Sequence, residues 1–165
     1  MSYATAIEQL SALTPELYRK PDQPRRKFSL DEIGVLLGAL GDPQRRLRAV
    51  LIAGTNGKGS TAATLASILT ASGMRAGLYT SPHLARVNER IRIGETEIGD
   101  DDFARLYFQV DDAARKLVEE GRLPQFPSFF EILTAQALLY FAEASVDAAV
   151  LEVGMGGWLD ATNIV

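Results

Sequence analysis

Residues 49–61 read AVLIAGTNGKGST, and this stretch decides the fold. The apolar run 49–53 has the length and composition of a buried strand, and the residues after Ser60 favour a helix that ends at Gly73. A strand, a tight glycine turn and a helix N-terminus place several backbone N–H groups and the positive end of a helix dipole around one point. Because such a point attracts phosphate, the stretch predicts a phosphate-binding loop.

Within this loop, Lys58 adds a full positive charge, and either Ser60 or Thr61 can offer a hydroxyl to a magnesium ion. The pattern departs from the usual Walker A loop, because Ile52 stands where the first glycine belongs and Gly59 separates the lysine from the hydroxyl residue. A simpler interpretation is a glycine-rich turn that only joins a strand to a helix. The candidate nucleotide-binding residues are Gly54, Thr55, Asn56, Gly57, Lys58, Gly59, Ser60 and Thr61.

The composition is that of an ordinary globular domain: 165 residues, 47% hydrophobic, with a net charge of −4. No apolar run approaches the ~20 residues that span a bilayer, and residues 1–20 lack a signal-peptide core, so a cytoplasmic location without a membrane partner is expected. The acidic balance argues against a nucleic-acid partner. Without cysteine and with a single histidine, the chain has neither thiolate sites nor a multi-histidine zinc site, so any metal is expected to be oxygen-ligated Mg²⁺.

Apolar periodicity predicts strands that alternate with helices. Helices are expected from Tyr3, from a capping box at Ser29 to a stop at Gly41, after Ser60, from a cap at Asp100 to Gly121, and from a capping box at Ser128. Strands are expected at 49–53, 75–80 and 146–153, with a hairpin over 90–98. This order predicts an α/β fold with a P-loop and a mostly parallel sheet flanked by helices. Ligands would bind beyond the carboxyl ends of the strands, where Gly54, Ser81 and Glu152 fall.

Two regions are expected along the chain: a helical lead-in and linker over 1–48, with prolines at 15, 21 and 24, and a P-loop α/β core over 49–165. Residues Asn163 to Val165 look like the opening of a further strand, which would leave the sheet with an unpaired apolar edge. We therefore expect the sheet to be incomplete at its C-terminus, the chain to be the amino-terminal part of a longer enzyme, and a C-terminal domain to be absent.

Three further segments accompany the glycine loop: TSPHL at 80–84 with NERI at 88–91, FEILTA at 130–135, and LEVGMGG at 151–157 with DATN at 160–163. In their order and separation they resemble the folylpolyglutamate synthase and dihydrofolate synthase family of the Mur ligase superfamily. The resemblance implies a Mur-ligase-like ATP-binding domain. One position departs from it, because Trp158 stands where the family usually has arginine, which removes a charge and up to five donors.

The resemblance implies an ATP-dependent ligase whose carboxylate substrate attacks the γ-phosphate of ATP to give an acyl phosphate. The amine of L-glutamate then displaces phosphate, and an amide forms. The implied partners are ATP, Mg²⁺, L-glutamate and either folate or dihydropteroate, and the full-length enzyme is expected to be a monomer. Glutamylation of folates, of dihydropteroate or of both stays open. Two alternatives are a Mur-type peptide ligase and an inactive, truncated nucleotide-binding module.

Lys58 and Glu152 are the candidate catalytic residues. Glu152 ends an apolar strand, where a buried carboxylate is costly unless a cation or another partner accompanies it. The resemblance implies that Glu152 and Ser81 hold Mg²⁺ and that His83 and Arg90 lie near the pterin-bearing substrate. The glycine loop itself offers Ser60 as a further metal ligand. The simpler interpretations are a solvated strand end for Glu152, a turn residue for Ser81, and packing or surface roles for His83 and Arg90.

Overall fold

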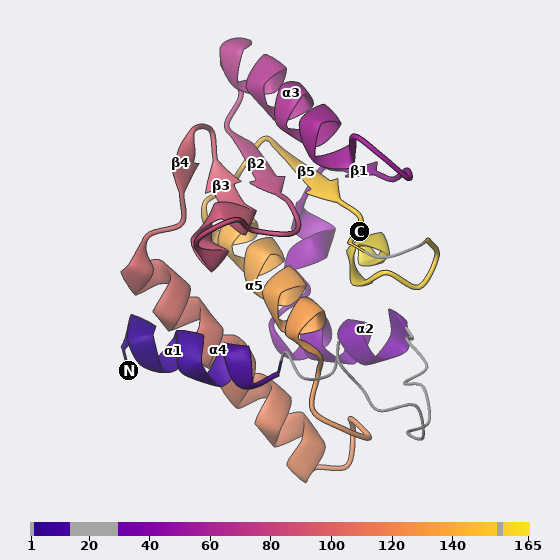
Figure 1. Ribbon diagram of the computed structural model, residues 1–165. Coiled ribbons are helices and arrows are strands. Elements are labelled where there is room, and N and C mark those ends of the chain that lie inside the picture. Colours follow the sequence, from indigo (N-terminus) through magenta and orange to yellow (C-terminus); the bar gives the residue numbers. More distant parts are fainter. Residues whose placement is uncertain (1, 14–29, 155–156) are drawn as a thin grey trace.

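The computed structural model describes residues 2–13, 30–154 and 157–165, and its centre is a five-stranded sheet with helices on both faces (Figure 1). The strand order is β1-β5-β2-β3-β4. The first three strands of this order run parallel, whereas β3 and β4 form the antiparallel hairpin that the sequence predicts. The sheet is therefore mixed. The strands are β1 (Ala49–Ile52), β2 (Ala76–Tyr79), β3 (Ile91–Ile93), β4 (Thr96–Glu97) and β5 (Ala148–Glu152).

Five α-helices and three short 3₁₀ turns are described around this sheet. The capping box predicted at Ser128 is present, since Ser128 Oγ accepts from the Glu131 N–H and the Glu131 carboxylate accepts from the Ser128 N–H. The helices are α1 (Tyr3–Ala12), α2 (Leu30–Ala39), α3 (Lys58–Ala71), α4 (Asp100–Glu119) and α5 (Phe129–Glu143), and the 3₁₀ turns are η2 (Pro43–Arg46), η3 (Val87–Arg90) and η4 (Ala161–Ile164). None of these helices is long and apolar enough to cross a bilayer.

The strands divide the core into two parts, because successive side chains of a strand point to opposite faces. Leu78 of β2 and Val150 of β5 pack with two alanines of α3 in a small cluster. The neighbouring Tyr79 and Leu151 belong to the large cluster that α1, α2, α4 and α5 complete on the other face. Figure 1 shows this arrangement, with α3 alone on one side of the sheet and α5 crossing the other.

Three local expectations were wrong. The strand at 49–52 is only partly buried, with Val50 41% exposed, because β1 stands at one end of the strand order. The last residues form the 3₁₀ turn η4 instead of a strand, since the Asp160 carboxylate accepts from the Thr162 N–H and hydroxyl and so favours a turn. The N-cap of α4 is Gly99, and Asp100 is the first helical residue.

Some expectations fall on parts of the chain that the structure does not describe. These are the Ser29 end of the first capping box, the proline-containing linker, and residues 155–156 of the LEVGMGG segment.

Gly77 of β2 leaves room for the ring of Phe141, which is fully buried. A Cβ at position 77 would lie 2.8 Å from Phe141 Cδ1, so Gly77→Ala should force the core to shift and lower the free energy of unfolding by about 1–3 kcal/mol. Gly38→Ala is the matched control, because that helical glycine is exposed and a Cβ there meets nothing within 4 Å. It should stabilise the protein by about 0.5–1 kcal/mol. Urea unfolding measures both, and a neutral Gly77→Ala would contradict the packing described.

Candidate active site

The glycine loop joins β1 to α3 and is exposed to solvent from residue 53 to residue 57. Gly57 is the N-cap of α3 with φ +73°, a conformation that favours glycine. Lys58 is the first residue of the helix, and its turn closes where the Thr61 N–H donates to Gly57 O over 2.9 Å. The N–H groups of the first helical residues have no partner inside the helix, so the loop presents donors and the positive end of α3 to solvent.

Glu152 lies directly against this helix N-terminus. It is the last residue of β5 and only 5% exposed. Its Oε2 accepts the Ser81 N–H over 3.0 Å, and a Cβ placed on Gly59 would lie 3.3 Å from the same oxygen. Glu152 is therefore not a solvated strand end. The fold brings together a helix N-terminus, the end of β2 and the end of β5, which the sequence separates widely.

The register of the sheet explains this convergence. Glu152 pairs with Ile52 of β1, and the preceding Leu151 pairs with Tyr79 of β2. The three parallel strands thus end at one level, and the loops that follow β1 and β2 leave beside Glu152. This is the edge at which ligands bind in open α/β sheets.

Residues 84–86, in the segment that follows β2, are held by one carboxylate. Glu89 of η3 accepts the backbone N–H groups of Leu84, Ala85 and Arg86 at 2.8, 2.8 and 2.7 Å. These three bonds lower the pKa of Glu89 to about 2. The carboxylate is therefore charged at neutral pH and fixes the loop that carries Ser81 and His83.

Arg90 and His83 form a second contact between η3 and this loop. Arg90 Nε donates to His83 Nδ1 over 2.8 Å, and the Arg90 guanidinium lies 5.2 Å from the centre of the Phe129 ring. Arg90 is 8% exposed, and burial lowers its pKa although Tyr79 and Glu152 nearby raise it. Burial and the Arg90 charge lower the pKa of His83, against a weaker opposing effect of Glu89. His83 is thus neutral at physiological pH.

Two of these features could not be assigned from the sequence. Glu89 lies in the NERI segment, but nothing in the sequence of this polar segment predicts that its carboxylate accepts three backbone hydrogen bonds. Tyr79 is fully buried where β2 ends, and burial raises the pKa of its hydroxyl, which accepts a 3.3 Å hydrogen bond from Thr134. It reads in the sequence as one apolar residue of a strand.

The donor set around Glu152 suits a hard cation. Glu152 offers carboxylate oxygens in a buried position, Ser81 lies beside it, and Ser60 is one residue beyond Gly59 on α3. No group of three or more His, Asp or Glu side chains able to hold a metal occurs among the described residues. This pattern matches Mg²⁺, which takes one or two protein ligands and completes its shell with phosphate oxygens and water.

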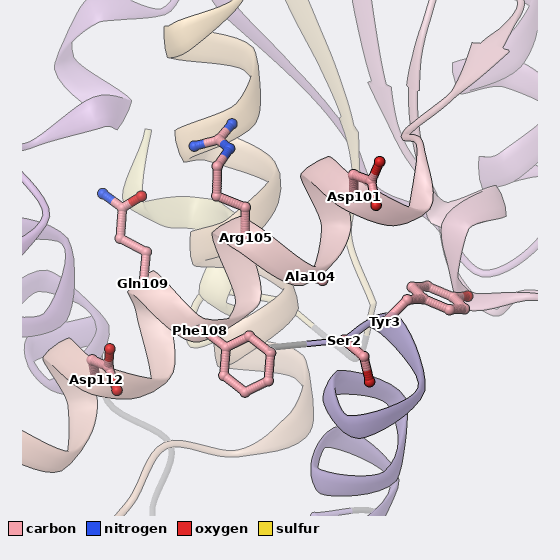
Figure 2. A pocket seen from close by; sticks show the side chains of 8 residues that line it. All are labelled: Ser2, Tyr3, Asp101, Ala104, Arg105, Phe108, Gln109 and Asp112. Atoms are coloured by element: carbon pink, nitrogen blue, oxygen red, sulfur yellow. The ribbon is translucent and has the colours of Figure 1, made fainter.

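A pocket of about 830 Å³ lies elsewhere, between the start of α1 and the outer side of α4 (Figure 2). Figure 2 shows Ser2 and Tyr3 on the α1 side and Phe108 reaching toward them from α4. Its charged lining residues are partly engaged, since Arg105 pairs with Asp102 and Glu143. None of the residues predicted to bind nucleotide, metal or substrate lines this pocket.

Comparison of the sequence and of the structure with known proteins finds relatives of the same kind. The chain is 41% identical over 142 residues to the dihydrofolate synthase/folylpolyglutamate synthase of Bacillus subtilis, which covers 84% of this chain and 32% of that protein. The crystal structure of folylpolyglutamate synthase from Thermotoga maritima superposes with a TM-score of 0.84 at 44% identity, covering 99% of this chain and 36% of that one. An FPGS–AMPPCP–folate complex gives a TM-score of 0.86 at 38% identity, covering 100% and 38%. The chain spans about a third of the length of these proteins. No family model matches it.

The three hydrogen bonds to Glu89 generate a pH prediction. The pKa of Glu89 is lower in the folded protein than its ordinary value of 4.5, so the bonds stabilise the loop fully above that value and are lost as the pH falls toward about 2. An NMR titration should show the amide signals of Leu84, Ala85 and Arg86 moving together with an apparent pKa well below 4. Glu89→Gln should accelerate hydrogen exchange of these amides, whereas Glu97→Gln, which removes an ion pair with Arg92, should not. A Glu89 carboxylate that titrates near 4.5 would contradict the three backbone hydrogen bonds described.

Proposed function

Because the chain belongs to the folylpolyglutamate synthase/dihydrofolate synthase family, we propose that it forms the ATP-binding part of a ligase that adds glutamate to folates. One observation carries the proposal: the buried Glu152 carboxylate, the Ser81 N–H and the N-terminus of α3 meet at the carboxyl ends of the parallel strands. This edge combines the positive end of a helix with an oxygen ligand for a cation, as a magnesium–nucleotide complex requires.

In the proposed complex, the N–H groups at the start of α3 and the Lys58 ammonium bind the phosphates of ATP. Glu152 and Ser81, with Ser60, hold Mg²⁺, which when bound neutralises charge on the phosphate oxygens. The lack of a side chain at Gly59 matters for this arrangement, because a larger residue there would crowd the Glu152 carboxylate. The first turn of α3 therefore lies closer to the carboxylate than a residue with a Cβ would allow without a small shift.

The reaction proposed for the whole enzyme joins a folate carboxylate to the amine of L-glutamate. The substrate carboxylate attacks the γ-phosphate, the bond to ADP breaks, and an acyl phosphate forms. The amine then attacks the acyl carbon, phosphate leaves, the amine loses a proton, and the amide remains. Negative charge on the transferring phosphoryl group is what Lys58 and the dipole of α3 stabilise. A structure of a relative in complex with AMPPCP and folate supports these substrates.

Lys58→Ala should weaken binding of ATP to the chain by about 1.5–3 kcal/mol, because it removes a charge-assisted hydrogen bond to phosphate. Titration with a fluorescent ATP analogue in the presence of Mg²⁺ measures the effect. Arg46→Ala is the control, since that exposed arginine lies in η2 at the other end of β1 and should leave the affinity unchanged. Equal affinities of wild type and Lys58→Ala would refute the phosphate-binding role of the loop.

Glu152→Gln should abolish the dependence of nucleotide affinity on Mg²⁺, because the amide keeps the shape and an acceptor for the Ser81 N–H but removes the charge. The melting temperature of the metal-free protein should change little, because the removal of a buried charge and the loss of its attraction to Arg90 and to the positive end of α3 oppose each other.

The matched control is Asp147→Asn, an exposed carboxylate just before the opposite end of the same strand, where it accepts the Arg75 N–H. Calorimetric titration of the nucleotide with and without Mg²⁺ compares the variants. Mg²⁺ dependence that persists in Glu152→Gln would place the metal site elsewhere.

A further inference from the structure

The contact between Arg90 and His83 determines which ring nitrogen of the histidine carries the proton. A guanidinium stays protonated in proteins, so Arg90 Nε is always a donor, and its partner atom must accept. At 2.8 Å that partner is His83 Nδ1, which therefore carries no proton. The neutral imidazole must then hold its proton on Nε2.

We propose that Arg90 is a positioning residue that acts through His83, holding the ring in the Nε2–H tautomer so that it donates to an acceptor on the substrate. The acceptor class is a carbonyl, carboxylate or ring-nitrogen atom of a folate-type molecule. The identity of the substrate rests on the proposed function, whereas the tautomer follows from the contact alone. This role differs from direct binding of substrate by Arg90.

Burial of Arg90 favours the indirect role. The residue is 8% exposed, its Nε is committed to His83, and its guanidinium lies over the Phe129 ring. Its backbone oxygen accepts the Thr80 N–H over 3.0 Å, which ties the end of η3 to the end of β2. These contacts hold the Arg90 side chain and the end of η3 against the loop that carries His83, so they fix where the imidazole lies.

The turn η3 is itself anchored, so it can hold the histidine rigidly. The Asn88 amide donates to Ile98 O over 2.8 Å and to Asp100 Oδ1 over 3.1 Å, and it also accepts from the Tyr3 hydroxyl. Glu89 holds the tip of the same loop through its three backbone bonds. Within the described part of the chain, the charged groups that act on the His83 ring are Arg90 and Glu89, both from η3.

Because His83 is the only histidine, ¹⁵N-histidine labelling gives a single pair of ring signals. Long-range ¹H–¹⁵N spectra of the ligand-free chain at pH 8 should show a protonated Nε2 and an unprotonated Nδ1. In Arg90→Met, a fraction of the Nδ1–H form should appear, because the donor is gone. Arg90→Lys should restore the Nε2–H form, since the ammonium is again a donor.

Arg92→Met is the matched control, because Arg92 lies two residues further and pairs with Glu97 instead of His83. It should leave the tautomer unchanged. An Nδ1–H tautomer in the wild type overturns the proposal even if Arg90→Met does not fold. A pure Nε2–H signal in a folded Arg90→Met overturns it as well.

A double-mutant cycle tests the action through His83. Arg90→Met and His83→Ala should each weaken folate binding by about 3- to 10-fold, and the double variant should lose no more than one of them. Losses that multiply would show that Arg90 contacts the substrate on its own. Failure of the folded wild-type chain to bind folate would contradict the proposed substrate, whereas the tautomer, measured without ligand, is decided independently.

Discussion

The burial of one carboxylate, that of Glu152, is the constraint on which the candidate site depends. A buried carboxylate must be compensated by donors or a cation, and the Ser81 N–H supplies one donor. Further compensation comes from the charge of Arg90 nearby and from the positive end of α3. The start of α3 and Ser81 follow β1 and β2, and the parallel register of these strands with β5 brings both to Glu152. Arg90 reaches the same place on η3, just before the antiparallel strand β3. The sheet therefore serves the site by aligning the ends of three strands.

Around this carboxylate, the structure combines a firmly held loop with an open one. The loop after β2 is fixed by Glu89 and by the bond from Arg90 to His83, so Ser81 and His83 keep their places without a ligand. The glycine loop after β1 is exposed, and it ends at Gly57, the N-cap of α3. This division favours binding in which rigid groups orient the substrate while the phosphates meet accessible N–H groups.

Much of this architecture was predictable because it depends on local patterns. The glycines at 54 and 57 mark the turn before α3, the Ser128 box marks the start of α5, and alternation marks the hairpin. The errors came from features that depend on the whole fold. Exposure of Val50 follows from the position of β1 in the strand order, and the turn at 161–164 follows from the Asp160 carboxylate. The sequence pointed to Glu152 and Ser81, whereas the pairing of Arg90 with His83 needed the three-dimensional contact.

The most direct test of the site is a map of where a metal–nucleotide complex binds. Mn²⁺ accepts the same oxygen ligands as Mg²⁺ and broadens the NMR signals of nearby nuclei. Small amounts of Mn²⁺ with an ATP analogue should broaden the amide signals of Gly59, Ser60, Ser81 and Glu152 before any others. Selective broadening at Ser2, Arg105 and Gln109, which line the pocket between α1 and α4, would contradict the account.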